Sequence, residues 1–179
     1  MDNLQTKFQK EISKKLKEEL GIKNVHEIPT MLKIVVNMGV KDAVADKKNM
    51  ELAIDQLTAI VGQKPKITAA KSSIAAFKVR EGDKIGLVTT LRGKRMYQFF
   101  EKLTNVVFPR LKDFHGIKRN SFDGHGNFTL GFAETSVFPE IDLGKIERSF
   151  GMEITIVTNA KEDKKGLALL EALGMPFVK

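Results

Sequence analysis

Two short strand-like segments, residues 66–70 (KITAA) and 84–92 (KIGLVTTLR), follow each other with no helical pattern between them. The stretch that joins them, about 71–84, is polar and basic and contains Gly82. Strands this close in sequence favour antiparallel pairing. The sequence therefore predicts a strand pair joined by an exposed loop or hairpin arm.

Apolar patterns along the rest of the chain predict helices around further strands. Helices are expected at 4–20, about 43–61, about 94–108 and about 161–173, and strands at 31–40, 128–138 and 152–158. Gly21, Gly62, Pro109 and Gly174 stand where these helices should end. The stripe on the first helix, repeating every four residues from Leu4, favours core packing over a surface for a partner helix.

This order of elements predicts an α+β fold. We expect a single domain over residues 1–179, with an antiparallel or mixed sheet and helices packed on one face. Two loops, at about 71–84 and 111–127, should protrude. An open sheet face would offer a platform for RNA.

Positive charge is concentrated in one segment. Residues 62–95 carry nine Lys or Arg and two acidic residues, a net charge of +7, whereas the whole chain carries +8. Solvated surfaces mix both signs, so a one-sided segment indicates a polyanion such as an RNA backbone. No apolar run approaches the roughly 20 residues that cross a bilayer, and the charged N-terminal stretch does not resemble a secretion signal.

The residues give little support to catalysis or metal binding. Cysteine is absent, and the histidines are His26, His115 and His125, without usual metal-ligand spacing. The segment FDGHGN around Asp123 is not a phosphate-cradling motif. We expect no catalytic residue, metal or cofactor.

Several polar residues stand where they could contact RNA. Arg92, Lys94 and Arg95 lie where a strand passes into a helix, and a helix N-terminus favours phosphate. Asn37, Gln63 and Thr90 are uncharged groups that could read base edges or sugars. Aromatic content is 7%, which argues against a mode built on stacking single-stranded bases and favours recognition of folded RNA.

Five segments resemble the bacterial form of large-subunit ribosomal protein five, a 5S ribosomal RNA-binding family. They are KIVVNMGV (33–40), GQKPKITAAKSSIAAFKVREG (62–82), GLVTTLRGKRMYQFFEKL (86–103), RNSFDGHGNFTLGFAETSVFPEI (119–141) and the closing ALLEALGMPF. They occur in order over almost the whole chain, and GQKP, TLRG and GHGNFTLG with FPEI are specific in combination.

The resemblance implies a non-enzymatic structural protein, on the cytoplasmic ribosome, that anchors 5S RNA in the central protuberance of the large subunit. The implied 5S-binding residues, with the helix-start cations included, are Asn37, Met38, Gly39, Gln63, Lys64, Thr90, Arg92, Lys94 and Arg95. The implied loop towards transfer RNA in the peptidyl site contains Lys71, Ser72, Lys78, Arg80 and Lys84. The region near 110–145 would face a protein of the small-subunit head in an intersubunit bridge, and 23S RNA and neighbouring large-subunit proteins would be further partners.

Two alternatives share parts of this pattern. A free-standing RNA chaperone or regulatory binder would have the same electrostatics. An RNA-processing enzyme would need a nucleophile, metal set or cofactor motif, and the sequence offers none.

Overall fold

The computed structural model describes residues 4–40, 43, 46–112, 114–142, 144 and 148–178. Its chain divides into two compact units. Unit 1 comprises residues 1–34, 91–130 and 155–179, and unit 2 comprises residues 35–90 and 131–154. The expectation of a single domain over residues 1–179 stays a prediction.

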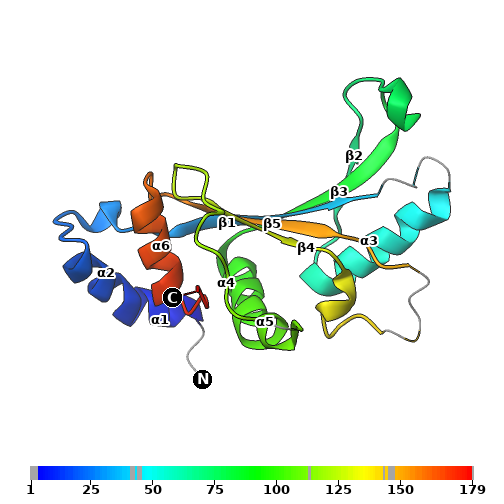
Figure 1. Ribbon diagram of the computed structural model, residues 1–179. Helices are drawn as coiled ribbons and strands as arrows, with labels where there is room; N and C mark the ends of the chain where they lie inside the picture. Colours follow the sequence, from blue (N-terminus) through cyan, green and yellow to red (C-terminus); the bar gives the residue numbers. More distant parts are fainter. Residues whose placement is uncertain are drawn as a thin grey trace. The chain divides into compact units, whose positions relative to one another are not determined.

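Five strands form one sheet in the order β2-β3-β1-β5-β4. Their bounds are β1 Met31–Gly39, β2 Lys66–Ala69, β3 Lys84–Leu91, β4 Phe128–Phe132 and β5 Met152–Thr158. Strands β2 and β3 pair antiparallel, and the arrows alternate in direction across the sheet in Figure 1. The predicted α+β class with an antiparallel sheet is confirmed.

Unit 2 is built on α3 (Lys47–Val61) and the strands around it. The Asp46 side chain accepts a hydrogen bond from the Lys48 amide at the start of the helix, and Gly62 ends it in a left-handed conformation (φ 71°). The helix therefore begins later than the predicted residue 43. Of the predicted first turn, residues 44 and 45 lie outside the described residues.

Gly86 allows close approach inside the β2–β3 pair. It lies opposite Thr68 in the antiparallel register. A Cβ atom at Gly86 would lie 2.9 Å from Thr68 Oγ1 and 3.1 Å from the Met38 backbone oxygen. The missing side chain thus lets three strand segments meet at this point.

Unit 1 contains the N-terminal helical segment, made of α1 (Leu4–Lys7), a π-helical turn (Phe8–Ile12) and α2 (Ser13–Glu19). It also contains α6 (Asp163–Ala172) and a helix made of α4 (Gly93–Lys102), a π-helical turn (Leu103–Val107) and α5 (Phe108–Arg110). Pro109 does not end this helix as predicted. It is the second residue of α5, and the helix continues past it to Arg110.

The glycine-rich loop before β4 is anchored within unit 1. The Gly126 amide donates to Asp163 Oδ1 at 2.9 Å, and the Thr158 hydroxyl donates to the Gly126 oxygen at 2.7 Å. A Cβ atom at Gly166 would lie 2.7 Å from that same oxygen. Glycine at both positions therefore permits the loop to lie directly on α6.

Short 3-10 turns occur at Val25–Glu27, Ala75–Phe77 and Thr135–Val137. The last of these interrupts the strand predicted over 128–138, so β4 ends at Phe132. Among the described residues, no helix has both the length and the apolar composition needed to cross a bilayer.

Candidate nucleic-acid interface

Unit 2 exposes the face of β1 that α3 does not cover. Asn37 and Gly39 are exposed, whereas Val36 and Met38 are completely buried. Successive side chains of a strand point to opposite faces. Asn37 and Gly39 therefore lie together on the open face.

Met38 does not share this surface. Its side chain is 0% exposed and belongs to the core. The expectation that Met38 belongs to the 5S-binding residues stays a prediction, and strand alternation leaves only its backbone able to reach the open face.

Thr90 lies on the open face of β3. It is half-buried, and its neighbours Thr89 and Leu91 are buried on the other side. Because β3 lies next to β1 in the sheet, Thr90 and Asn37 present uncharged polar groups from adjacent strands. Such groups can donate and accept hydrogen bonds with bases and sugars.

Lys66 and Thr68 extend this face, although they are not among the site residues that the sequence predicts. They pair with Val88 and Gly86, whereas Ile67 between them pairs with Leu87, which is buried. Residues paired across a ladder share a face. The alternation of polar and apolar residues in KIT indicates that Lys66 and Thr68 share one face of the strand. Only the register with β3 shows that this is the open face.

Gln63 and Lys64 occupy the turn between α3 and β2. Gly62 reverses the chain after the helix, its amide donating to the Thr58 oxygen at 2.8 Å. Lys64 is exposed and Gln63 half-buried, while Pro65 is buried and fixes the chain where β2 begins. The predicted pair thus lies in unit 2 with Asn37, Gly39 and Thr90.

The other three predicted 5S contacts belong to unit 1. Arg92 precedes α4 in an extended conformation, and Lys94 and Arg95 lie in its first turn, which contains no acidic residue. All three side chains are exposed. Their position at a helix N-terminus is the predicted one, and the helix dipole adds to their attraction for an anion.

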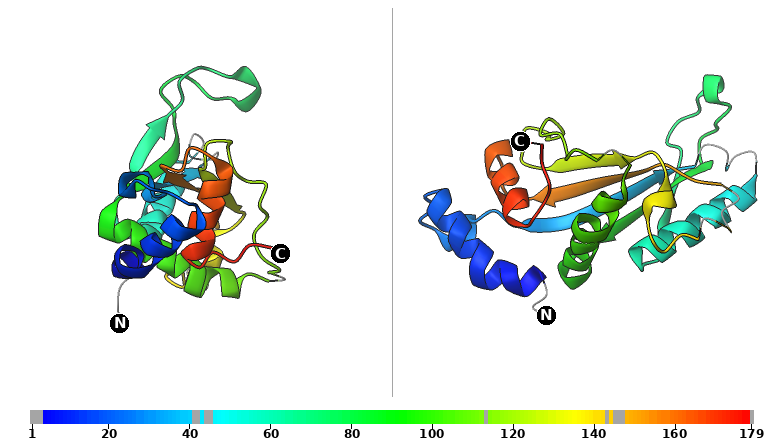
Figure 2. Two further views of the ribbon diagram at one scale, coloured as in Figure 1. Left: turned by 90° about the vertical axis from the view of Figure 1, so that its left-hand side faces the viewer. Right: turned by 60° about the horizontal axis from the view of Figure 1, so that its bottom comes forward.

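The loop between β2 and β3 projects away from the strands of unit 2 (Figures 1 and 2). Lys71, Ser72, Lys78 and Arg80 are exposed along it. Lys84 is also exposed but is the first residue of β3. It therefore lies at the base of the loop.

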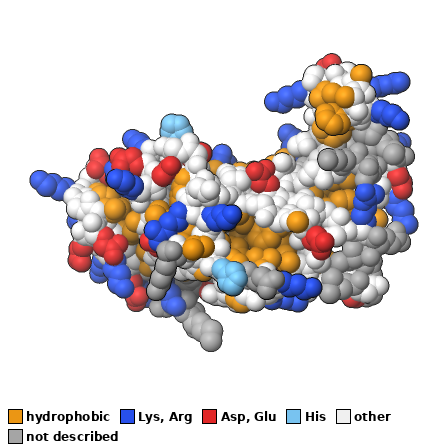
Figure 3. Space-filling model, viewed as in Figure 1, with side chains coloured by type: hydrophobic (Ala, Val, Ile, Leu, Met, Phe, Trp, Pro, Cys, Tyr) orange, Lys and Arg blue, Asp and Glu red, His pale blue; other side chains and the backbone are white. Residues whose placement is uncertain are grey.

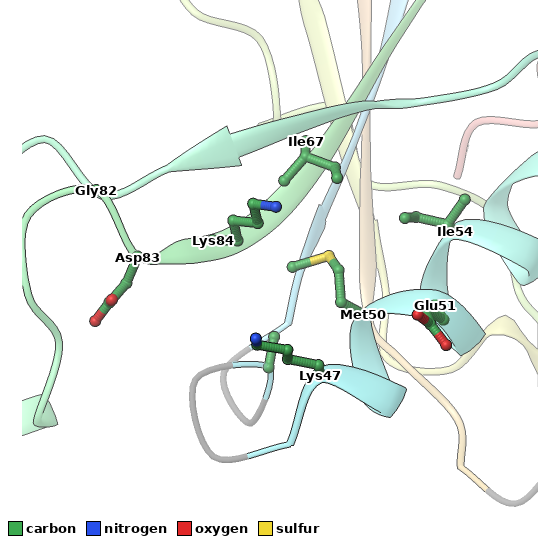
Figure 4. A pocket seen from close by; sticks show the side chains of 9 residues that line it. Lys47, Met50, Glu51, Ile54, Ile67, Gly82, Asp83 and Lys84 are labelled. Carbon is green, nitrogen blue, oxygen red and sulfur yellow. The ribbon is translucent and has the colours of Figure 1, made fainter.

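A groove of about 520 Å³ lies between this base and α3 (Figure 4). Met50, Ile54 and Ile67 supply apolar lining, and Lys47, Glu51, Asp83 and Lys84 supply two charges of each sign. This balanced lining gives no preference for phosphate.

In the segment around Asp123, nearby amide groups donate hydrogen bonds to the Asp123 carboxylate. Asp123 Oδ1 accepts from the amides of His125 (2.9 Å) and Asn127 (3.1 Å), and Oδ2 accepts from Asn127 Nδ2 at 2.7 Å. The hydrogen bond from the Asn127 side chain is the largest influence on the pKa of Asp123 and lowers it. Desolvation is the next largest and opposes it, while the two amides and the electrostatic influence of His125 lower the pKa further. The amides that a phosphate would need are thus engaged within the loop.

His115 and His125 are both exposed. Within the ranges that the structure describes, no three His, Asp or Glu side chains are grouped so that they could hold a metal ion.

Comparison with known proteins gives the same family along the whole chain. Residues 24–80 match the model of ribosomal protein L5, and residues 84–177 match the model of the C-terminus of the same ribosomal protein family. The large ribosomal subunit protein uL5 of Thermoanaerobacter sp. (strain X514) is 51% identical over 179 residues, covering 100% of both chains. Proteins of the same name from Francisella tularensis subsp. tularensis (strain SCHU S4 / Schu 4) and Mesoplasma florum are 51% and 49% identical, over 99% and 98% of both chains.

The two family models together match most of the chain, and the Thermoanaerobacter relative aligns with it over the full length of both proteins. The family consists of structural proteins of the ribosome and is not enzymatic, so the alternative of an RNA-processing enzyme is set aside. The chain belongs to the uL5 family of large-ribosomal-subunit proteins.

Proposed function

We propose that this ribosomal protein binds 5S RNA with the open face of unit 2 and the cations that flank it. The observation that carries the proposal is that Asn37, which is exposed, and Thr90, which is half-buried, present uncharged polar groups on adjacent strands. Lys64 and Lys66 supply exposed charge in the same unit. Charge would hold the RNA backbone while the polar groups discriminate sequence or shape.

Arg92, Lys94 and Arg95 would contact further phosphates of the same RNA. Their exposure and their place at the start of α4 support this role. The position combines three cations with the favourable end of a helix dipole. Contacts of the protein with 23S RNA and with neighbouring large-subunit proteins would complete its anchoring in the central protuberance.

The projecting loop 71–84 would reach transfer RNA in the peptidyl site. Its exposed Lys71, Lys78 and Arg80 and its extension from the strands support the assignment. Residues near 110–145 would contact the small-subunit head. Asp113, Leu143 and Lys145 of that region lie outside the described residues.

Measuring how the full chain binds 5S RNA tests the proposed role of the open face of unit 2. Asn37→Ala and Thr90→Ala should each weaken specific binding by about 1–3 kcal/mol, since each removes a group able to read a base or sugar. The slope of affinity against salt should stay nearly unchanged, because neither residue is charged. Filter binding or calorimetry on 5S RNA and on a scrambled RNA of equal length measures both quantities.

Asn105→Ala and Thr6→Ala are matched controls in unit 1, with Asn105 exposed and Thr6 half-buried on helices. They should leave 5S binding unchanged. Equal losses for 5S RNA and scrambled RNA with Asn37→Ala and Thr90→Ala would refute the specificity role of the open face.

A further inference from the structure

The loop between β2 and β3 has a fixed shape of its own. Ile74 and Val79 form an isolated antiparallel bridge, with amide-to-oxygen distances of 2.9 and 3.3 Å. Below the bridge, the Arg80 amide donates to Asp83 Oδ2 at 2.7 Å, and the Glu81 amide donates to Ser73 Oγ at 2.9 Å. These bonds organise the loop without any partner, so whatever its tip presents is held in place beforehand.

The tip presents an aromatic ring to solvent. Phe77 is 75% exposed and Ile74 is 45% exposed. The chain contains 12 phenylalanines, and the other 11 are buried or half-buried. The Phe77 amide donates to the Ile74 oxygen at 3.2 Å in the 3-10 turn, so local backbone bonding fixes the turn that carries the ring.

Lys78, which follows this ring, adopts a left-handed conformation with φ 53°. Among the described residues, only Lys78 and Lys161 do so without being glycine. Glycine would adopt this conformation without steric cost. A lysine here keeps a cation beside Phe77 at the expense of backbone strain, and such strain is concentrated at functional positions.

Charge around the tip favours an anionic partner. Residues 74–80 contain two cations, Lys78 and Arg80, and no acid. Both side chains are exposed, and Figure 3 shows apolar side chains beside Lys and Arg side chains on this projecting loop. A flat apolar ring flanked by cations complements a nucleobase flanked by phosphates, whereas an apolar protein surface would leave both charges without counterions.

We propose that Phe77 stacks on an exposed nucleobase of the peptidyl-site transfer RNA while Lys78 and Arg80 contact the adjoining phosphates. This inference rests on the proposed contact of the loop with transfer RNA. It assigns the anchoring role to an aromatic ring, although the low aromatic content of the sequence argued against stacking. One ring carried on a hydrogen-bonded turn is enough for a single base contact.

Ribosomes that carry variants of this protein provide the test, with deacylated transfer RNA titrated into the peptidyl site. Phe77→Ala should raise the dissociation constant by roughly 5- to 150-fold, the range for loss of one stacked base. Phe77→Trp should keep wild-type affinity, because it preserves a flat ring. Phe77→Leu should resemble Phe77→Ala more than Phe77→Trp, since it keeps apolar area but has no flat face.

The salt dependence of transfer RNA affinity distinguishes the contribution of the Phe77 ring from that of the cations. Phe77→Ala should leave the slope of affinity against salt unchanged, whereas Lys78→Gly should reduce it by about one counterion, without disturbing a left-handed position. Val25→Ala removes another exposed apolar side chain, 63% exposed and in unit 1. This control should change neither affinity nor slope.

Failure of this inference and failure of the proposed function give different results. If deletion of residues 73–82 leaves transfer RNA affinity unchanged, the loop does not contact transfer RNA, and both the stacking contact and the proposed loop contact with transfer RNA are wrong. If the deletion weakens binding but Phe77→Ala does not, only the stacking contact is wrong. A photo-crosslinker at position 77 should label a transfer RNA base, and labelling of a ribosomal protein instead would overturn the assignment.

Discussion

At the scale of single residues, burial differs sharply between residues that are adjacent in the same sequence motif. Asn37 and Met38 are adjacent, but one is exposed and the other 0% exposed. Thr89 and Thr90 differ in the same way, with Thr89 3% exposed. A one-residue step along a strand exchanges core for surface, so each motif contributes only alternate side chains to a face.

The stability of a Thr89 variant tests the assignment of Thr89 to the buried face of β3. Its Oγ1 is buried and has no hydrogen-bond partner among the described residues. Thr89→Val removes the hydroxyl at nearly constant volume, so the free energy of unfolding should rise by about 1–2 kcal/mol. Urea denaturation measures the change.

Thr158→Val is the matched control. Thr158 is also buried, but its hydroxyl donates to the Gly126 oxygen at 2.7 Å and accepts from the Ala160 amide at 3.2 Å. This variant should lower the free energy of unfolding. A loss of stability in Thr89→Val as well would mean that the Thr89 hydroxyl has a partner in solution.

At the scale of elements, the β2–β3 pair depends on the absence of a side chain at Gly86. Gly86→Ala would place a Cβ atom 2.9 Å from Thr68 Oγ1 and 3.1 Å from the Met38 oxygen. Such overpacking should lower the free energy of unfolding by about 1–3 kcal/mol. Denaturation of the full chain measures it.

Gly131→Ala in β4 is the control, because a Cβ atom there meets nothing within 4 Å. It should have a much smaller effect. Adding Thr68→Ala to Gly86→Ala should restore part of the lost stability, since it removes the nearer of the two contacts. No recovery would assign the whole cost to the Met38 backbone.

At the scale of the whole molecule, the charge concentrated in residues 62–95 lies on the surface. All nine Lys and Arg side chains of this segment are exposed. Affinity for 5S RNA should therefore fall steeply with salt, as expected for about 4–7 neutralised phosphates. A salt titration of the binding constant measures the slope, and a flat response would refute the electrostatic account.

Deletion of residues 73–82 tests which of these cations bind 5S RNA and which bind transfer RNA. The deletion removes Lys78 and Arg80 but leaves the open face of unit 2 and the start of α4 in place. The 5S salt slope should change little. A slope reduced by two counterions would assign the loop to the 5S site.

Elements with strong local signals were predicted closely. The predicted strand 152–158 coincides with β5, and Gly21, Gly62 and Gly174 follow their helices in left-handed conformations. Local signals were less reliable where tertiary contacts compete. Pro109 lies inside a helix, and β4 ends at Phe132, where the chain turns into a 3-10 segment at Thr135.

The sequence by itself determined the α+β class, the family and the charged segment, because periodicity, specific motifs and charge are properties of the chain in order. The tertiary structure decided which residues of that segment share a face. It buried Met38, joined Lys66 and Thr68 to the open face, and left Phe77 exposed. The physical reason is that facing depends on strand register and on the covering helix, and both are set by contacts between residues distant in sequence.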